Sequence, residues 1–275
     1  MAEPAVGRPV RARAEVLWLR NEGGENRRLA LAIEGWPGFE PGQFVMLSPG
    51  PLTSVRRSDP LLPRPMAVYR ERTAAGGAHI EILFKRQGRG TALLAESAPG
   101  QQIELLGPLG RPFTEPAPEE RPVLVGGGTG VASIYALAAR LAARGRPAEV
   151  LLGAGTASDL MAEADFAELG VALRVATEDG SRGHRGLVTE LLVPALEAPG
   201  AARVYACGPT GMMQRCAELA TERGHSCAVS LENPMACGFG VCLGCAAPLR
   251  AGGFALVCRD GPVFEASAVD WEGLP

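Results

Sequence analysis

The chain has 275 residues, with 47% hydrophobic and 21% charged side chains and a formal net charge of −3 at pH 7. This length suggests two or three domains, and the composition is that of an ordinary globular protein rather than a disordered or fibrous one. The charge gives no electrostatic case for nucleic acid, no apolar stretch could span a bilayer, and no secretory signal is visible, so we expect a cytoplasmic protein.

The first part of the chain, residues 10–110, predicts short antiparallel strands. Leucine and isoleucine alternate with arginine or alanine over 28–33, as in a strand with one buried face. Further apolar runs at 43–47 and 79–84 are bounded by glycine or proline, and no long helical pattern occurs before Thr91. Short strands at fairly regular spacing favour an antiparallel barrel or sandwich.

From about residue 121 the pattern alternates between strand and helix. Such alternation predicts a doubly wound parallel sheet covered by helices on both faces. The proline-rich segment 108–122 is a plausible linker to the first part, and beyond about residue 230 the chain becomes rich in loops. The predicted strands are 123–125, 150–152, 173–176 and 204–207. The first predicted helix follows the glycine-rich turn and ends near 144, and the others cover 158–169, 187–196 and 211–223.

The strongest motif is a group of cysteines near the C-terminal end with the spacing C-x4-C-x2-C-x12-C. Its members are Cys237, Cys242, Cys245 and Cys258. The first three match the spacing of plant-type [2Fe–2S] ligands, and the intervening glycines permit a tight loop that turns backbone N–H groups toward the sulfurs. The alternative is a structural zinc site, although such sites usually use two C-x2-C pairs and only one occurs here. An odd total of seven cysteines argues against a disulfide framework.

A glycine-rich turn connects a predicted strand to a predicted helix, the arrangement that holds a dinucleotide pyrophosphate on a helix N-terminus. Its residues are Gly126, Gly127, Gly128, Thr129 and Gly130. The match to G-x-G-x-x-G lacks the final glycine, so a simple tight turn is the alternative. Cys207, followed by Gly208 and Pro209, ends the last parallel strand, where such sheets bind ligands. The alternative for Cys207 is a buried residue before a turn, and we expect Cys216 and Cys227 to be buried in that way.

In the strand-rich part, Arg64 could pair with a phosphate, and the turn that contains Gly90 and Thr91 offers backbone N–H groups and a hydroxyl. Alone, these features are more often surface charge and turn chemistry.

Taken in this order, the features resemble the ferredoxin-reductase superfamily, and within it the iron–sulfur electron-transfer subunits of NAD-dependent (class B) dihydroorotate dehydrogenases. The segment from Glu232 to Cys245 matches that family's E-x-x-M-x-C-G-x-G-x-C-x-x-C, and the segment from Thr177 to Thr189 resembles its T-[DE]-D-G-S-x-G pattern. The resemblance covers essentially the whole chain. It implies an FAD-binding β-barrel over 1–110, an NAD-binding α/β domain over 111–228 and a [2Fe–2S] domain over 229–275.

The resemblance also implies roles for individual residues. NAD would bind over 126–130 and at Gly208 and Pro209, with its nicotinamide near Cys207 as the catalytic residue. Ala67 stands where the family has a hydroxyl, and Phe84 where it often has tyrosine. The implied FAD site, with Arg64 on the phosphate, comprises Arg64, Pro65, Met66, Ala67, Leu83, Phe84, Lys85, Gly90 and Thr91.

The implied function is electron transfer between NAD and the FMN of a separate dihydroorotate dehydrogenase catalytic subunit, through FAD and the cluster, in a heterotetramer of two subunits of each kind. A flavin suits this role because it exchanges hydride with nicotinamide and single electrons with a cluster. One alternative keeps the cofactors but changes the partner, as in ferredoxin:NADP oxidoreductases, sulfide dehydrogenases or hydrogenase-linked reductases. Another is a non-catalytic module with a zinc-stabilised tail. NAD rather than NADP follows only from the resemblance, because Arg174, Arg182 and Arg185 could meet a 2′-phosphate.

Overall fold

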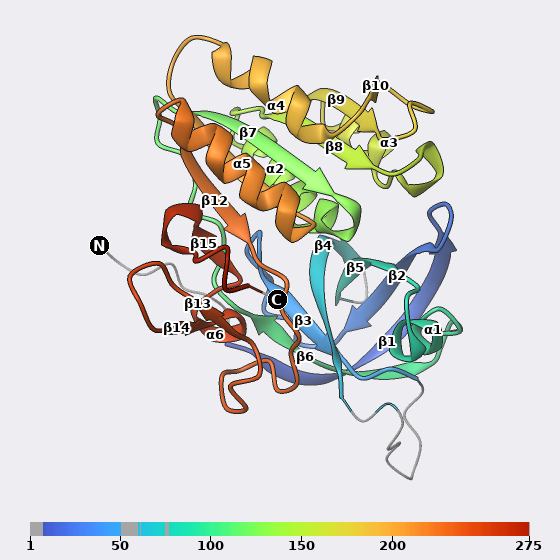
Figure 1. Cartoon of the computed structure of the whole chain (residues 1–275). Helices are drawn as coiled ribbons and strands as arrows, with labels where there is room; N and C mark the ends of the chain where they lie inside the picture. Colours follow the sequence, from blue (N-terminus) through green and yellow to red (C-terminus); the bar gives the residue numbers. More distant parts are fainter. Residues whose placement is uncertain (1–7, 51–59, 61, 75–76, 275) are drawn as a thin grey trace.

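The computed structural model describes residues 8–50, 60, 62–74 and 77–274. A strand barrel and a sheet with helices on both faces lie one above the other, and a C-terminal segment runs along the side of both (Figure 1). Within the described residues, none of the helices has the length and hydrophobicity that a membrane crossing requires.

The barrel is closed and antiparallel, which confirms the predicted strand type. Leu29, Leu31 and Ile33 of one strand point into its apolar interior, where they meet Ile80 and Ile82. The short helix α1 (Arg89–Leu94) follows the fifth strand. The strands, in their order around the barrel, are β1 (Val10–Asn21), β2 (Asn26–Ile33), β5 (Gly77–Lys85), β4 (Arg64–Ala74), β3 (Phe44–Leu47) and β6 (Gln102–Leu109).

The sheet has seven strands and confirms the predicted doubly wound core. Six strands are parallel, but β15 comes from the C-terminal segment and pairs antiparallel with β12, which the sequence did not predict. The order across the sheet is β10 (His184–Arg185), β9 (Ala172–Thr177), β8 (Glu149–Ala154), β7 (Arg121–Gly127), β11 (Ala202–Cys207), β12 (Ser226–Ser230) and β15 (Val263–Glu265).

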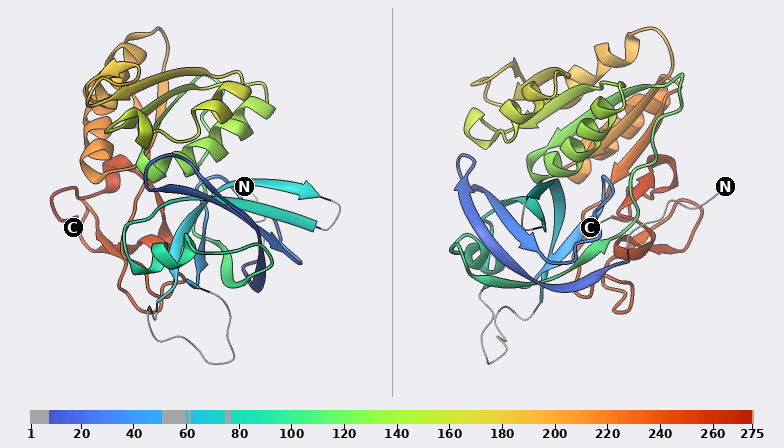
Figure 2. Two further views of the ribbon diagram at one scale, coloured as in Figure 1. Left: turned by 90° about the vertical axis from the view of Figure 1, so that its right-hand side faces the viewer. Right: turned by 180° about the vertical axis from the view of Figure 1, so that it is seen from behind.

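Helices cover both faces of the sheet (Figure 2). Helix α2 (Val131–Ala143) is buried nearly all round because it lies between the sheet and β4 of the barrel. The 3-10 turn η1 (Gly128–Gly130) leads into α2. Helix α3 (Glu163–Glu168) packs on the same face of the sheet through Phe166. Helices α4 (Val188–Glu197) and α5 (Thr210–Glu222) cover the opposite face.

The predicted helix over 158–169 is wrong in its first half. A 3-10 turn, η2 (Ala157–Asp159), comes first, and the α-helix begins only at Glu163. The Thr156 hydroxyl donates to Asp159 Oδ2 at 3.0 Å, and Ala162 then takes a left-handed conformation with φ of 64°. Such local side-chain bonds compete with the helix and delay its start.

An ionic cluster joins the barrel to the helical half. Asp165 of α3 receives hydrogen bonds from the Tyr69 hydroxyl at 2.6 Å and from Arg70 Nη1 at 3.1 Å, and it also pairs with Arg28. Burial raises the pKa of Asp165, but these hydrogen bonds and the two guanidinium charges outweigh it, so the pKa lies below its usual value.

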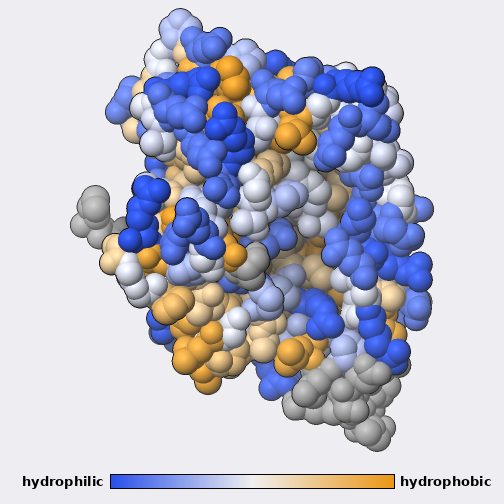
Figure 3. Space-filling model, viewed as in Figure 1, coloured by the Kyte–Doolittle hydropathy of each residue, from blue (hydrophilic) through white to orange (hydrophobic). Residues whose placement is uncertain are grey.

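The C-terminal segment contacts both halves of the molecule. Its Cys245, Val257 and Cys258 share an apolar core with Met46 and Leu109 of the barrel. At its lower end it exposes apolar side chains that gather on one face (Figure 3). The large apolar side chains that this segment exposes are Phe239, Val241, Leu243 and Phe254, which are 53%, 72%, 63% and 73% exposed. Its elements are β13 (Ala246–Pro248), β14 (Phe254–Leu256), α6 (Val257–Asp260), β15 and η3 (Ala266–Ala268).

Candidate functional site

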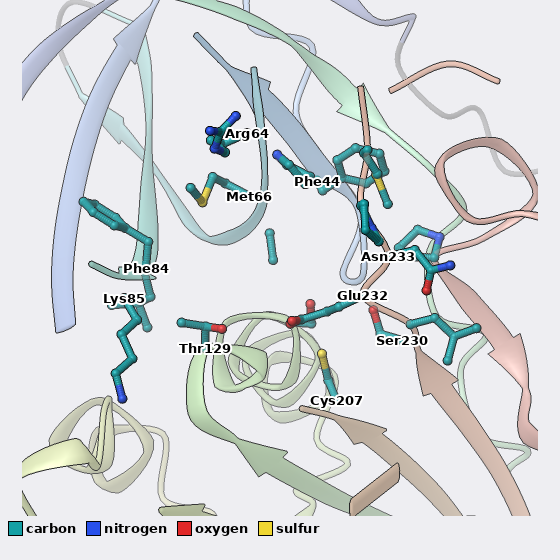
Figure 4. A pocket seen from close by; sticks show the side chains of 18 of the residues that line it. Phe44, Arg64, Met66, Phe84, Lys85, Thr129, Cys207, Ser230, Glu232 and Asn233 are labelled. Atoms are coloured by element: carbon teal, nitrogen blue, oxygen red, sulfur yellow. The ribbon is translucent and has the colours of Figure 1, made fainter. Parts of the chain in front are cut away.

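Two cavities lie along the junction between barrel and sheet. The first, of about 360 Å³, is bounded by β4 and β5 of the barrel, by the ends of β11 and β12, and by the beginning of the C-terminal segment (Figure 4). It brings together most of the residues that the sequence assigned to a flavin. On its wall are Arg64, Pro65, Met66, Ala67, Leu83, Phe84, Lys85 and Thr91 from the barrel, and Thr129, Ser133, Cys207, Ser230 and Glu232 from the other half.

Arg64 lies at the wall of this first cavity, next to the beginning of α1, and its Nη1 donates to the Leu62 carbonyl at 2.8 Å. Gly90 lies directly against it, and a Cβ at that position would come within 2.5 Å of Arg64 Nε, so a larger residue would push the guanidinium away. The Thr91 hydroxyl accepts the backbone N–H groups of Gln87 and Gly88 at 2.9 and 3.1 Å and so stabilises the turn. The arrangement presents a fixed positive charge of the kind that binds phosphate.

The end of β5 sends its successive side chains in different directions. Leu83 packs at the junction with the helical half, whereas Phe84 is buried in the barrel core. Lys85, the single lysine of the chain, extends toward the helical half and places its Nζ 3.5 Å from Asp159 Oδ1 (Figure 4). Its charge therefore lies toward the second cavity, which it also lines.

Cys207 ends β11 and faces Glu232 across the floor of the first cavity (Figure 4). Burial raises the pKa of Cys207 to about 12, and the negative charge of Glu232 acts in the same direction, against weaker opposite effects of Ser230 and Ser133. Glu232 opens to the cavity but is surrounded by protein, and this loss of water raises its pKa as well. The floor is therefore small, polar and built around a neutral thiol.

The second cavity, of about 460 Å³, lies outside the carboxyl ends of β7, β8 and β9, where doubly wound sheets bind ligands. Of the residues predicted for NAD, Gly127, Gly128 and Pro209 line it, whereas Thr129 and Cys207 line the first cavity. The two cavities are neighbours and share Lys85.

The other predicted glycines shape this turn without reaching either cavity. A Cβ on Gly130 would lie 2.4 Å from the carbonyl of Cys207, so glycine allows the start of α2 to approach the end of β11. Gly208 has φ of 150°, and a Cβ there would lie 2.8 Å from the carbonyl oxygen of Gly127. A Cβ on Gly126 would be 3.2 Å from Leu152. Gly130 thus performs the close helix–strand packing for which the G-x-G-x-x-G pattern uses its last glycine.

The four predicted cluster cysteines come together from two segments. Cys245 Sγ lies 3.2 Å from Cys258 Sγ, and both are buried. Cys258 also interacts with Cys237, which in turn contacts Cys242 at the exposed edge of the group. Leu243, with φ of 60°, helps to close this loop. Cys216 and Cys227 lie elsewhere and are buried, as predicted.

The surroundings of Cys237 favour an anionic sulfur. Burial would raise the pKa of this thiol, but backbone N–H groups of Cys242, Phe239 and Val241 point at it and lower the pKa to about 6. Among the described residues, no three His, Cys, Asp or Glu side chains are placed to hold a single metal ion. Four thiols, three of which receive backbone N–H donors (Cys237, Cys245 and Cys258), fit a cluster that brings its own sulfide better than they fit one zinc ion.

Sequence reasoning missed the part of the site that follows β12. Ser230 and Glu232 line the first cavity together with Ser133 of α2, and Glu178 lines the second. The available signal was position, because Ser230 and Glu178 lie at or just after the carboxyl ends of parallel strands. Glu232 was noticed only as part of the cysteine motif.

Family models of known proteins match two parts of the chain. Residues 232–270 match a family model described as the iron–sulfur cluster binding domain of dihydroorotate dehydrogenase B, and residues 124–218 match an oxidoreductase NAD-binding domain. The chain is 39% identical over 236 residues to the dihydroorotate dehydrogenase B (NAD(+)) electron transfer subunit of Geobacillus thermodenitrificans, which covers 84% of this chain and 86% of that protein. It is also 37% identical over 251 residues to a protein from Methanopyrus kandleri named as a probable subunit of the same kind. That match covers 91% of this chain and 88% of that protein.

A solved structure is similar over nearly the whole length. It is that of an NADH-dependent reduced ferredoxin–NADP oxidoreductase, reported in connection with flavin-based electron bifurcation, with a TM-score of 0.81 and 28% identity over 99% of this chain and 92% of that one.

Proposed function

The chain belongs to the family of electron transfer subunits of dihydroorotate dehydrogenase B, and on this premise we propose that it carries electrons between NAD and the FMN of a separate catalytic subunit that converts dihydroorotate to orotate in pyrimidine biosynthesis. The cofactors would be FAD in the first cavity, NAD in the second and a [2Fe–2S] cluster on the four cysteines. A cytoplasmic location remains a prediction from the sequence.

One observation carries the proposal: the first cavity lies between the other two sites. It shares Lys85 with the second cavity on one side. On the other side Met235 lines it, two residues before Cys237, and a Cβ on Gly238 would lie 2.6 Å from Met46 of the barrel. A flavin bound there converts between hydride transfer and single-electron transfer, so the order of the sites is the order that the chemistry needs.

The residues around the first cavity have roles that follow from their surroundings. Arg64, backed by Gly90 and the Thr91 turn, would bind a flavin phosphate. Cys207 would present a small uncharged group to the nicotinamide, since its raised pKa keeps it protonated at neutral pH. Ala67 and Phe84 leave the flavin without a side-chain hydroxyl at these two positions.

The proposal assigns one cofactor to each of the three predicted domains, although the third is not a separate body. The barrel, 1–110, would hold FAD; 111–228 would hold NAD; and 229–275 would hold the cluster. The last segment is not separate in space, because β15 extends the sheet of the NAD-binding half.

The partner would dock beside the cluster. Phe239, Val241 and Leu243 are exposed apolar side chains of the loop that also carries the exposed Cys242, and Phe254 is a further exposed apolar side chain of the C-terminal segment. Exposed apolar patches of this kind mark protein interfaces. A catalytic subunit covering them would bring its FMN close to the cluster, in an assembly of two subunits of each kind.

Reconstitution with a dihydroorotate dehydrogenase catalytic subunit tests the proposal. The complex should reduce NAD⁺ with dihydroorotate, and the isolated chain should contain flavin with two iron and two sulfide ions per chain. One zinc ion without sulfide would contradict the cluster. Activity only with a ferredoxin-linked flavoprotein partner would favour the alternative that the similar oxidoreductase structure represents.

A further inference from the structure

The second cavity has an unusual balance of charge. Four charged side chains line it, and three are already paired. Lys85 pairs with Asp159 at 3.5 Å, and Arg215 has carboxylate partners of its own on α5. Glu178 makes no ion pair or side-chain hydrogen bond with any described residue, and it is exposed to solvent. The cavity therefore offers a ligand one unpaired charge, and that charge is negative.

Glu178 stands at a defined distance from the glycine turn. It directly follows β9, and β9 is separated from β7 by the single strand β8. Strands lie about 4.8 Å apart, so Glu178 is about 10 Å from the line of β7. If NAD binds as proposed above, with its nicotinamide toward Cys207 and its pyrophosphate at Gly127 and Gly128, the adenosine extends over β8 and reaches Glu178.

We propose that Glu178 selects NAD over NADP. Its carboxylate would accept a hydrogen bond from the 2′-hydroxyl of the adenosine ribose and would repel the 2′-phosphate of NADP. In dinucleotide-binding sheets an acidic residue often performs this task about 20 residues after the glycine turn. Here Glu149 has about that spacing, but it lies at the opposite, amino end of β8, where it pairs with Arg174.

The positive groups nearby do not compensate for Glu178. Arg182 pairs with Glu163, and neither Arg174, Arg182 nor Arg185 lines the cavity. Arg215 lines it but contacts two carboxylates, Glu218 at 3.0 Å and Glu222 at 3.3 Å.

The start of α4 also faces this cavity, and helix N-termini attract anions. Glu190 already occupies it, since its Oε1 accepts the Leu187 N–H at 3.2 Å.

The test compares two redox-inactive probes on the flavin- and cluster-loaded chain. ADP-ribose and 2′-phospho-ADP-ribose are titrated by calorimetry, and the ratio of their dissociation constants measures discrimination against the phosphate. Glu178→Gln should lower this ratio by about 10-fold, and Glu178→Asp should preserve most of it. Asp179→Asn is the matched control, because Asp179 accepts the Ser181 N–H at 2.9 Å and does not line the cavity. Added salt should weaken discrimination in the wild type and leave it unchanged in Glu178→Gln.

The experiment tests the proposed NAD site and the role of Glu178 separately. If the wild type does not bind ADP-ribose, the proposed NAD site is wrong and Glu178 has no role there. If ADP-ribose binds but Glu178→Gln leaves the ratio at the wild-type value, the assignment of Glu178 alone is overturned.

Discussion

The sheet and the C-terminal loop use cysteine under opposite conditions. Cys227 in β12 is surrounded by apolar side chains, and burial raises its pKa to about 12. Cys237 lies in a glycine-rich loop where backbone N–H groups lower its pKa to about 6. Cys207 combines the two, since it is buried but has Ser230, Ser133 and Glu232 around it. In this chain, backbone N–H groups outweigh burial at Cys237, whereas at Cys227 and Cys207 burial prevails.

The largest effect is expected from replacing a loop thiol. Cys242→Ser should reduce electron delivery to the catalytic subunit to background, because a hydroxyl does not replace a thiolate in the cluster. NADH oxidation by an artificial hydride acceptor should persist, since the cavities are untouched. Parallel steady-state assays with both acceptors measure this split, and equal retention of both activities would remove the cluster from the electron path.

The pH dependence of thiol alkylation should distinguish Cys237 from Cys227. In iron-free protein the thiolate of Cys237 is the major form above its pKa, so its alkylation rate should rise through about pH 6 and then level off. Cys227 should stay protected between about pH 5 and 9, because its raised pKa keeps it a neutral, buried thiol. Peptide mapping after iodoacetamide labelling measures the alkylation of Cys237 and Cys227 separately. Equal labelling of the two thiols at pH 7 would contradict the prediction.

The third prediction concerns Cys207, the thiol that is buried but has polar neighbours. Cys207→Ala should slow flavin reduction by NADH by about 10-fold, which corresponds to about 1.4 kcal/mol in the barrier, through loss of contact at the nicotinamide. Cys207→Ser should lose less, because Ser230 and Ser133 can partner the new hydroxyl. Stopped-flow absorbance gives the rate, and iron content serves as the control. A normal rate in Cys207→Ala would make this thiol a packing residue only.

The smallest effect concerns a thiol of the sheet half. Cys216→Ser buries a hydroxyl among apolar groups and should lower the free energy of unfolding by about 1–2 kcal/mol. Urea denaturation measures the change. Iron content should stay at the wild-type value, and its loss would mean that Cys216 supports the cluster after all.

How much the sequence could predict depended on how local each feature is. Three of the cluster cysteines and the glycine turn each lie within one short continuous segment, so spacing alone pointed to them. Glu178 and Glu232 acquire meaning only when strands far apart in the chain align their carboxyl ends, which no short pattern records. The late start of α3 came from one side-chain bond at Thr156, and the role of Gly130 depended on its approach to Cys207.

The pairing of β15 with β12 has a consequence for anyone who shortens this chain. Removing the C-terminal segment would uncover β12 along Ala228–Ser230, the stretch that β15 now covers. An uncovered edge strand offers unpaired N–H and C=O groups to any other chain. A truncated protein would therefore lose its cluster and also present the open edge of its sheet for self-association, so the C-terminal segment protects this edge as well as carrying the cysteines.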